Sequence, residues 1–195
     1  MKKRIFTFVL AVATMISCDV AKEFSGLTSL VNCKYSYNSI SNLSVAGTSM
    51  SSGLSLTSVA AVTSILTGNA SSIPLNFTLN LNIDNPNQST ALLRGMQYVI
   101  SIDGIQFTTG SMNQSLSIAS GQRQVLPLSI GVDLATLMKN NSKDAVVDIA
   151  KNIVGIGSKE STVSLQIKPS FMVNNSLVTS PVYLPVSFTF GGKKE

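Results

Sequence analysis

The chain has 195 residues, which is enough for one compact domain and too few for two large ones. It contains no His, no Trp and only 12% charged residues, whereas Ser, Thr and Asn together make up close to a third of it. Without His, the Ser-His and Cys-His nucleophile arrangements and His-ligated metal sites are excluded. The composition therefore argues against most enzymes, and we expect no catalytic residues, cofactor or metal centre. Because 44% of the residues are apolar and can form a core, we also expect a folded protein.

The first 17 residues have the layout of a secretory signal peptide. Three basic residues precede an uncharged stretch over residues 5–16, which at 12 residues is too short to cross a bilayer core of about 30 Å as a helix. The next residues complete the sequence Met15-Ile16-Ser17-Cys18, which resembles a bacterial lipobox. That resemblance implies cleavage before Cys18 and lipid on its thiol and its new amino group. The alternative is an ordinary signal peptide with an incidental Cys.

Removal of residues 1–17 changes the charge of the chain. Three of the 14 basic residues are lost with this segment and none of the nine acidic ones, so the net charge falls from +5 to +2. The remaining basic residues are scattered and form no stripe that could follow phosphates, so no nucleic acid partner is expected. The predicted location is the bacterial cell envelope, with the lipid on Cys18 in a membrane. Inner membrane, outer membrane and cell surface all remain open.

Cys33 is the second of the two cysteines. If Cys18 carries lipid, Cys33 is a single thiol, and we expect a small buried or half-buried side chain near the first strand. The alternative is a Cys18–Cys33 disulfide in a secreted protein without lipid.

After a short tether over residues 18–33, the hydropathy pattern predicts one domain over residues 34–190 and a polar tail over 191–195. Partial alternation predicts a strand over residues 35–45, and helical spacing predicts a helix over 56–66 that Ser55 caps and Gly68 ends. Strict alternation over residues 73–83 predicts a strand with one buried and one wet face.

Further strands are predicted in the second half of the chain. Residues 96–102 and 105–109 form a hairpin on a type I′ turn at Asp103-Gly104. Residues 116–118 and 126–132 are two more strands, with Pro127 near a sheet edge. Two short helices follow between Asp133 and Gly155, with Ser142 as the second cap and Gly155-Ile156-Gly157 as the stop. The last predicted strands cover residues 163–167, 171–173 and 182–190.

This element order predicts a mainly β fold, since a parallel α/β sheet would need a helix after nearly every strand. Three stretches then resemble a known family: Asn85-Pro86-Asn87 after the alternating strand, residues 100–104 with Gly110, and residues 119–121 before Leu126-Pro127-Leu128. They are similar to the late embryogenesis abundant group 2 family, which shares the water-stress and hypersensitive-response domain. The resemblance covers residues 72–132, continues more weakly over 163–167, and extends to lipid-anchored bacterial members.

The resemblance implies an immunoglobulin/fibronectin-like β-sandwich, here with a short helical insertion, and no catalytic activity. Asp84, Asn85 and Asn87 form the only local cluster of oxygen ligands that could bind Ca²⁺, and a turn explains these residues without any ligand.

The sequence therefore predicts a membrane-anchored, non-catalytic lipoprotein that binds or scaffolds an unknown envelope protein or lipid, with a stress-related role. The alternative is a carrier that holds an apolar ligand such as a lipid between sheet and helices. That alternative predicts a cavity lined by Val146, Ile149 and Ile153.

Overall fold

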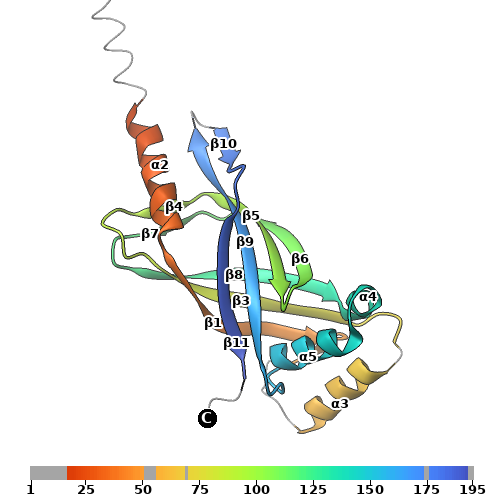
Figure 1. The fold of residues 1–195 in the computed structure, drawn as a ribbon. Helices are drawn as coiled ribbons and strands as arrows, with labels where there is room; N and C mark the ends of the chain where they lie inside the picture. The colour runs from red at the N-terminus through yellow and green to blue at the C-terminus, as the bar shows by residue number, and fades with distance from the viewer. Residues whose placement is uncertain (1–16, 51–55, 69, 174–175, 193–195) are drawn as a thin grey trace, which may run out of the picture.

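The computed structural model describes residues 17–50, 56–68, 70–173 and 176–192 (Figure 1). Most of the predicted signal peptide, the Ser55 cap and the last part of the predicted tail lie outside these ranges. Within them the fold is mainly β, as predicted, with four helices around two larger antiparallel sheets and a small two-stranded one. None of the helices in these ranges combines the length and the apolar run that a bilayer crossing requires.

The first sheet has the strand order β2 (Thr48–Ser49), β1 (Lys34–Val45), β3 (Pro74–Asp84) and β8 (Arg123–Asp133). Its central pairing, β3 with β8, is continuous and antiparallel, and the predicted alternation of β3 is confirmed. The buried positions of β3 are Leu75, Phe77, Leu79, Leu81 and Ile83. Pro127 faces solvent on β8, which is an edge strand. Its missing N–H therefore removes no hydrogen bond from the centre of the sheet.

The second sheet has the order β10 (Ser176–Thr179), β9 (Glu160–Val173), β5 (Gly95–Ile102) and β6 (Ile105–Met112), and β11 (Leu184–Gly191) also pairs with β9. The type I′ turn between β5 and β6 is confirmed, because Asp103 and Gly104 have φ of 49° and 81°. Asp103 also fixes this turn to β9. Its N–H donates to the Thr162 carbonyl (2.9 Å) and its carboxylate accepts from the Thr162 N–H (2.7 Å).

Strand β9 runs without interruption, where the sequence analysis predicts two separate strands over 163–167 and 171–173. Pro169 in its middle explains how this is possible. On one edge of β9, β11 pairs up to Ile167 and β10 pairs from Ser170 onward, so the missing N–H of Pro169 falls where neither strand is paired. The Pro169 carbonyl on that edge accepts from the Ser180 N–H (2.8 Å).

Three of the four described helices follow the prediction closely. Helix α3 (Leu56–Thr67) covers the predicted segment, and α4 (Leu134–Asn140) and α5 (Lys143–Ile153) form the predicted pair. Asp133 and Ser142 are their N-caps, as expected. A third, two-stranded sheet joins β4 (Ala91–Leu93) to the predicted strand β7 (Leu116–Ile118).

Asp133 does more than cap α4, because one carboxylate oxygen accepts from the N–H groups of Ala135 (2.8 Å), Thr136 and Ile73 (both 3.2 Å). The Ser72 hydroxyl donates to the other oxygen, and these donors hold the pKa of Asp133 below its ordinary value. We expect Asp133→Ala to lower the free energy of unfolding by about 1 kcal/mol in urea titrations. Ser142→Ala, which removes one 3.4 Å bond, is the matched control and should cost less. Equal losses would contradict the added role of Asp133.

The two larger sheets share one core, and Tyr98 connects them. Its ring lies in the core below β6, and its hydroxyl donates to the Ser129 carbonyl of β8 (3.1 Å). Gly110 of β6 leaves the space for this ring, since a Cβ there would lie 2.4 Å from the phenol oxygen.

We expect Gly110→Ala to displace the Tyr98 ring and to cost about 1–2 kcal/mol of unfolding free energy. The control is Gly131→Ala on β8, where an added Cβ would meet only the amide oxygen of the exposed Asn76 side chain. Urea unfolding followed by circular dichroism should separate the two variants. Equal stabilities would show that the Tyr98 ring moves freely.

Candidate functional site

The N-terminal helix α2 (Ser17–Val31) lies at one end of the molecule, beside the hairpin of β9 and β10 and opposite α3, α4 and α5 (Figure 1). The sequence analysis assigns no regular structure to this segment, which it predicts as a tether. Cys18 lies in the first turn of the helix. Its lipidation stays a prediction. The candidate site is the junction between α2 and the β domain.

The C-terminal half of α2 packs closely on β4. A Cβ on Gly26 would lie 2.7 Å from the Leu92 side chain, so a larger residue here would push the helix away from the strand. Leu30, one helical turn later, is buried in the common core. The Ser29 hydroxyl shares a hydrogen bond with that of Ser89 (2.6 Å). These contacts make α2 part of the domain.

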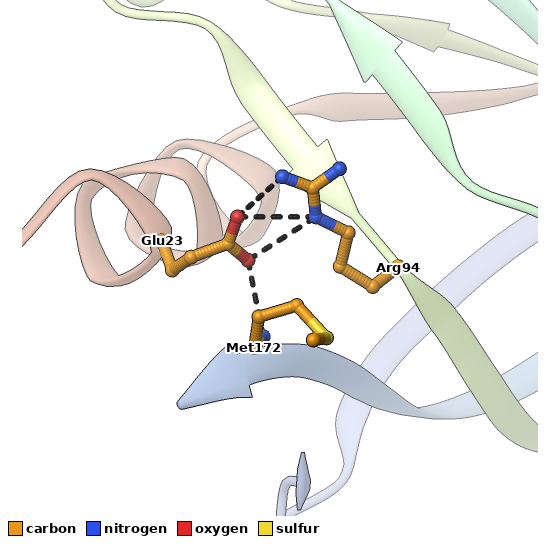
Figure 2. Close-up of polar contacts among 3 residues, drawn as sticks. All are labelled: Glu23, Arg94 and Met172. Atoms are coloured by element: carbon orange, nitrogen blue, oxygen red, sulfur yellow. Dashed lines mark hydrogen bonds and ion pairs between the residues drawn. The ribbon is translucent and has the colours of Figure 1, made fainter. Parts of the chain in front are cut away.

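Glu23 fixes the middle of α2 to the second sheet (Figure 2). One of its carboxylate oxygens accepts from Nε (3.0 Å) and Nη2 (2.5 Å) of Arg94, and the other accepts from the Met172 N–H (3.1 Å). The position of β5 explains this geometry. That strand ends its pairing with β9 at Gly95 and Ser170, so the Met172 N–H has no strand partner on this edge. The Glu23 carboxylate accepts the hydrogen bond that a neighbouring strand would otherwise accept from the Met172 N–H.

The electrostatics of Glu23 agree with a structural role. The hydrogen bonds from Arg94 hold the pKa of this carboxyl below its ordinary value, and the Met172 N–H acts in the same direction against the opposing effect of burial. Glu23 is only 8% exposed, so its charge depends on these partners for solvation. The arrangement can orient α2 against the second sheet.

A second junction joins the end of α2 to the turn after β3. Asn85 is 1% exposed, and its Nδ2 donates to the carbonyls of Ser89 (2.9 Å), Ile118 (2.8 Å) and Ala119 (3.3 Å). Its Oδ1 accepts from the backbone N–H and the Nδ2 of Asn87. The Asn87 Nδ2 also donates to the Ser29 carbonyl of α2 (2.8 Å).

The turn interpretation of Asn85 and Asn87 is therefore confirmed, and their side chains are occupied by protein groups. Asp84 does not join them, because its carboxylate accepts from Nε (2.6 Å) and Nη2 (3.1 Å) of Arg123 on β8. Among the residues whose placement is described, no three Cys, Asp or Glu side chains gather as a metal site would require.

Cys33 is buried as predicted, at the end of α2. Its thiol donates to the Ser29 carbonyl (3.2 Å), and it is a free cysteine. Burial, together with the nearby Asp84 carboxylate, raises the pKa of the Cys33 thiol to about 11. It is thus an unreactive core side chain at neutral pH.

An open groove of about 640 Å³ lies between the two sheets, away from α2. Residues 37–43 of β1 and Phe190 of β11 form its walls, and residues 152–155 at the end of α5 close it. Of the three residues predicted to line an apolar cavity, only Ile153 reaches it. Val146 and Ile149 are fully buried in the core.

Sequence comparison matches residues 80–171 to the family model described as late embryogenesis abundant protein (LEA_2). The match covers a little under half of the chain, from within β3 into β9. No curated protein matches the chain by sequence.

Several solved structures are similar at low identity. A protein from Arabidopsis thaliana has 13% identity and a TM-score of 0.39 over 66% of this chain and 77% of its own. A protein named as a late embryogenesis abundant (LEA) protein has 10% identity and a TM-score of 0.34 over 97% and 89%. A protein from Archaeoglobus fulgidus has 14% identity and a TM-score of 0.34 over 63% and 88%. The sequence comparison shows that residues 80–171 are similar to the late embryogenesis abundant family.

Proposed function

We propose that this protein is a non-catalytic lipoprotein of the bacterial cell envelope that is anchored by lipid on Cys18 and acts as a binding or scaffolding module. The sequence Met15-Ile16-Ser17-Cys18 supports the anchor, and the junction of α2 supports the scaffolding role. The helix that begins next to Cys18 is held to the β domain by Glu23 at its middle and by the Asn87 contact to Ser29 near its end.

A fixed helix gives an anchored protein a defined orientation, which a flexible linker would not. In an anchored protein, α2 would set the position of the β domain relative to the membrane. The end formed by α3, α4 and α5, which lies opposite α2 (Figure 1), would then face away from the membrane. This outer end and the groove beside α5 are then the surfaces available to an envelope partner.

The family match over residues 80–171 supports a stress-related role for the module and membership of the whole chain in that family. The two antiparallel sheets around one core support the finer fold assignment, an immunoglobulin/fibronectin-like β-sandwich with the helical insertion α4–α5.

The anchoring is tested by expressing the full chain, Cys18→Ser and the matched control Cys33→Ser in bacteria. We expect the full chain and Cys33→Ser in the membrane fraction, each beginning at residue 18 and carrying the added mass of acyl chains. Cys18→Ser should lack that mass and leave the membrane fraction. A mature chain without lipid, or one with a Cys18–Cys33 disulfide, would overturn the proposal.

The groove favours a second candidate function, the carriage of an apolar ligand such as a lipid. Its walls include the apolar side chains of Ile40, Leu43, Met50, Ile153 and Phe190. Mass spectrometry of an organic extract of the purified protein tests this function. A stoichiometric apolar compound would support the carrier, and an extract that contains only the acyl chains of Cys18 would count against it.

A further inference from the structure

Beyond Ser170, strands β9 and β10 form a two-stranded ribbon. Strand β5 ends opposite Ser170, whereas β10 pairs with β9 from Ser170 to Val173. The ribbon projects past the rest of the second sheet at the end of the molecule where α2 begins (Figure 1). Two-stranded ribbons have little stability of their own in water, so their surroundings matter.

The ribbon is apolar on both of its faces. Leu177 and Val178 are neighbours in β10, so their side chains point to opposite faces, and they are 53% and 39% exposed. A strand with a wet face carries polar residues there, as β3 does with Asn76 and Thr78. Helix α2 contacts β9 at Met172, whereas Leu177 and Val178 of β10 are exposed. The sequence of the ribbon therefore fits apolar surroundings on both faces.

Helix α2 adds a third exposed apolar side chain at the same end. Phe24 is 66% exposed and follows Glu23, whose carboxylate accepts from the Met172 N–H. Met172 in turn is the pairing partner of Leu177. Phe24 and the ribbon are thus held together through one ion-paired carboxylate, and their relative position does not depend on a flexible segment.

We propose that Phe24, Leu177 and Val178 insert into the interface of a lipid bilayer. These three residues, which include both sides of the ribbon, are together called the membrane face. This inference rests on the proposed function. Phe24 follows Cys18 by six residues, which is about 9 Å along a helix. The polar zone on each side of a bilayer is about 5–8 Å deep. When α2 is tilted in the membrane, a lipid on Cys18 therefore brings Phe24 and the adjoining ribbon into this zone. Exposed Lys22 on the same helix would meet lipid phosphates.

The membrane face would act as a second attachment beside the acyl chains. Apolar side chains at the interface add to the affinity of a lipid anchor, and two contacts fix an orientation that one cannot. The occupant we infer is the bilayer that holds the anchor. A second copy of this chain is the competing occupant, because the outer edge of β10 could pair with another strand.

The absence of Trp from the chain makes a direct test possible. Phe24→Trp and Leu177→Trp each place a single Trp in the membrane face, and Val125→Trp places one at a 45% exposed apolar position of the other sheet. The lipidated full chains are reconstituted into vesicles of phosphatidylcholine and phosphatidylglycerol. We expect blue-shifted emission and several-fold quenching by brominated lipids for the first two variants, and neither effect for Val125→Trp.

Other outcomes separate the two proposals. If the lipidated chain floats with the vesicles while the emission of Phe24→Trp and Leu177→Trp stays unshifted and unquenched, the membrane face is overturned and the anchor stands. If the chain does not float, the proposed function is overturned and this inference with it. Blue-shifted emission without quenching, together with a doubled mass in light scattering, would assign the face to a second copy and overturn the bilayer as its occupant.

Discussion

Replacing Asn85 with Ala is expected to lower the free energy of unfolding by about 3–4 kcal/mol, the largest effect of any single polar substitution considered for this protein. The Asn85 amide donates to three carbonyls and accepts two bonds from Asn87, all around a side chain that is 1% exposed. Truncation leaves the buried Ile118 carbonyl without this donor. It also removes the acceptor that orients Asn87 toward α2.

Urea unfolding followed by far-ultraviolet circular dichroism measures this loss, and Asn76→Ala is the matched control. Asn76 lies on the exposed face of β3, where substitution should change stability by less than about 0.5 kcal/mol. The near-isosteric Asn85→Asp should also destabilise at neutral pH, because a carboxylate cannot donate to the three carbonyls. Part of that loss should be recovered under acid conditions, when the carboxyl group is protonated. Similar stabilities for Asn85→Ala and Asn76→Ala would show that the turn does not depend on this network.

Local patterns were sufficient to predict most strands and helices. The alternation of residues 73–83 identifies β3 because one face of this strand is buried and the other is wet. The pair Asp103-Gly104 identifies the β5–β6 hairpin because both residues adopt positive φ. Asp133 and Ser142 mark the starts of α4 and α5 because their side chains bond the free N–H groups of the first turn.

Elements held by distant contacts could not be predicted in this way. Helix α2 contains Gly26 and several Ser and Thr residues, which lower its intrinsic helix propensity. It is stabilised by Leu92, Arg94 and Met172, and Met172 is 149 positions away from Glu23 in the sequence. No local sequence pattern indicates that Glu23 binds Arg94 and the edge of β9. The sequence does not indicate strand β10, because Leu177 and Val178 are adjacent and show no alternation of apolar and polar residues.

The site at Asn85 was predicted in part. The sequence Asn85-Pro86-Asn87 indicates a turn after β3, and the structure has one there. The burial of the Asn85 amide is not visible in the sequence, because two of its three carbonyl partners, Ile118 and Ala119, belong to another segment. A motif can thus identify the geometry of a turn without revealing that the turn joins three parts of the fold.

The second large effect is the loss of α2 attachment when Arg94, the positively charged partner of Glu23, is replaced. Arg94→Met keeps much of the aliphatic stem but leaves the buried carboxylate with the Met172 N–H as its remaining hydrogen-bond donor. We expect a loss of about 2–3 kcal/mol from the free energy that holds α2 to the domain, below the usual cost of breaking a buried pair because the Arg94 side chain is 38% exposed. Amide hydrogen exchange of α2 residues, corrected for intrinsic rates, measures this opening. If the protection of the α2 amides from hydrogen exchange is unchanged, the contacts of Gly26 and Leu30 hold the helix to the domain instead.

The dependence on pH gives the same contact an independent signature. The pKa of Glu23 lies below its ordinary value of 4.5 in the folded protein, so the pair stabilises the attached helix fully above that value and is lost as the pH falls through the lowered pKa. In Arg94→Met the guanidinium no longer opposes the effect of burial, so the pKa of Glu23 rises and α2 should open at a higher pH. Glu23→Gln, which does not titrate, should remove this pH dependence of α2 and leave the acid sensitivity that Asp133 gives to α4. Identical α2 profiles for the wild type and Glu23→Gln would show that another group controls the helix.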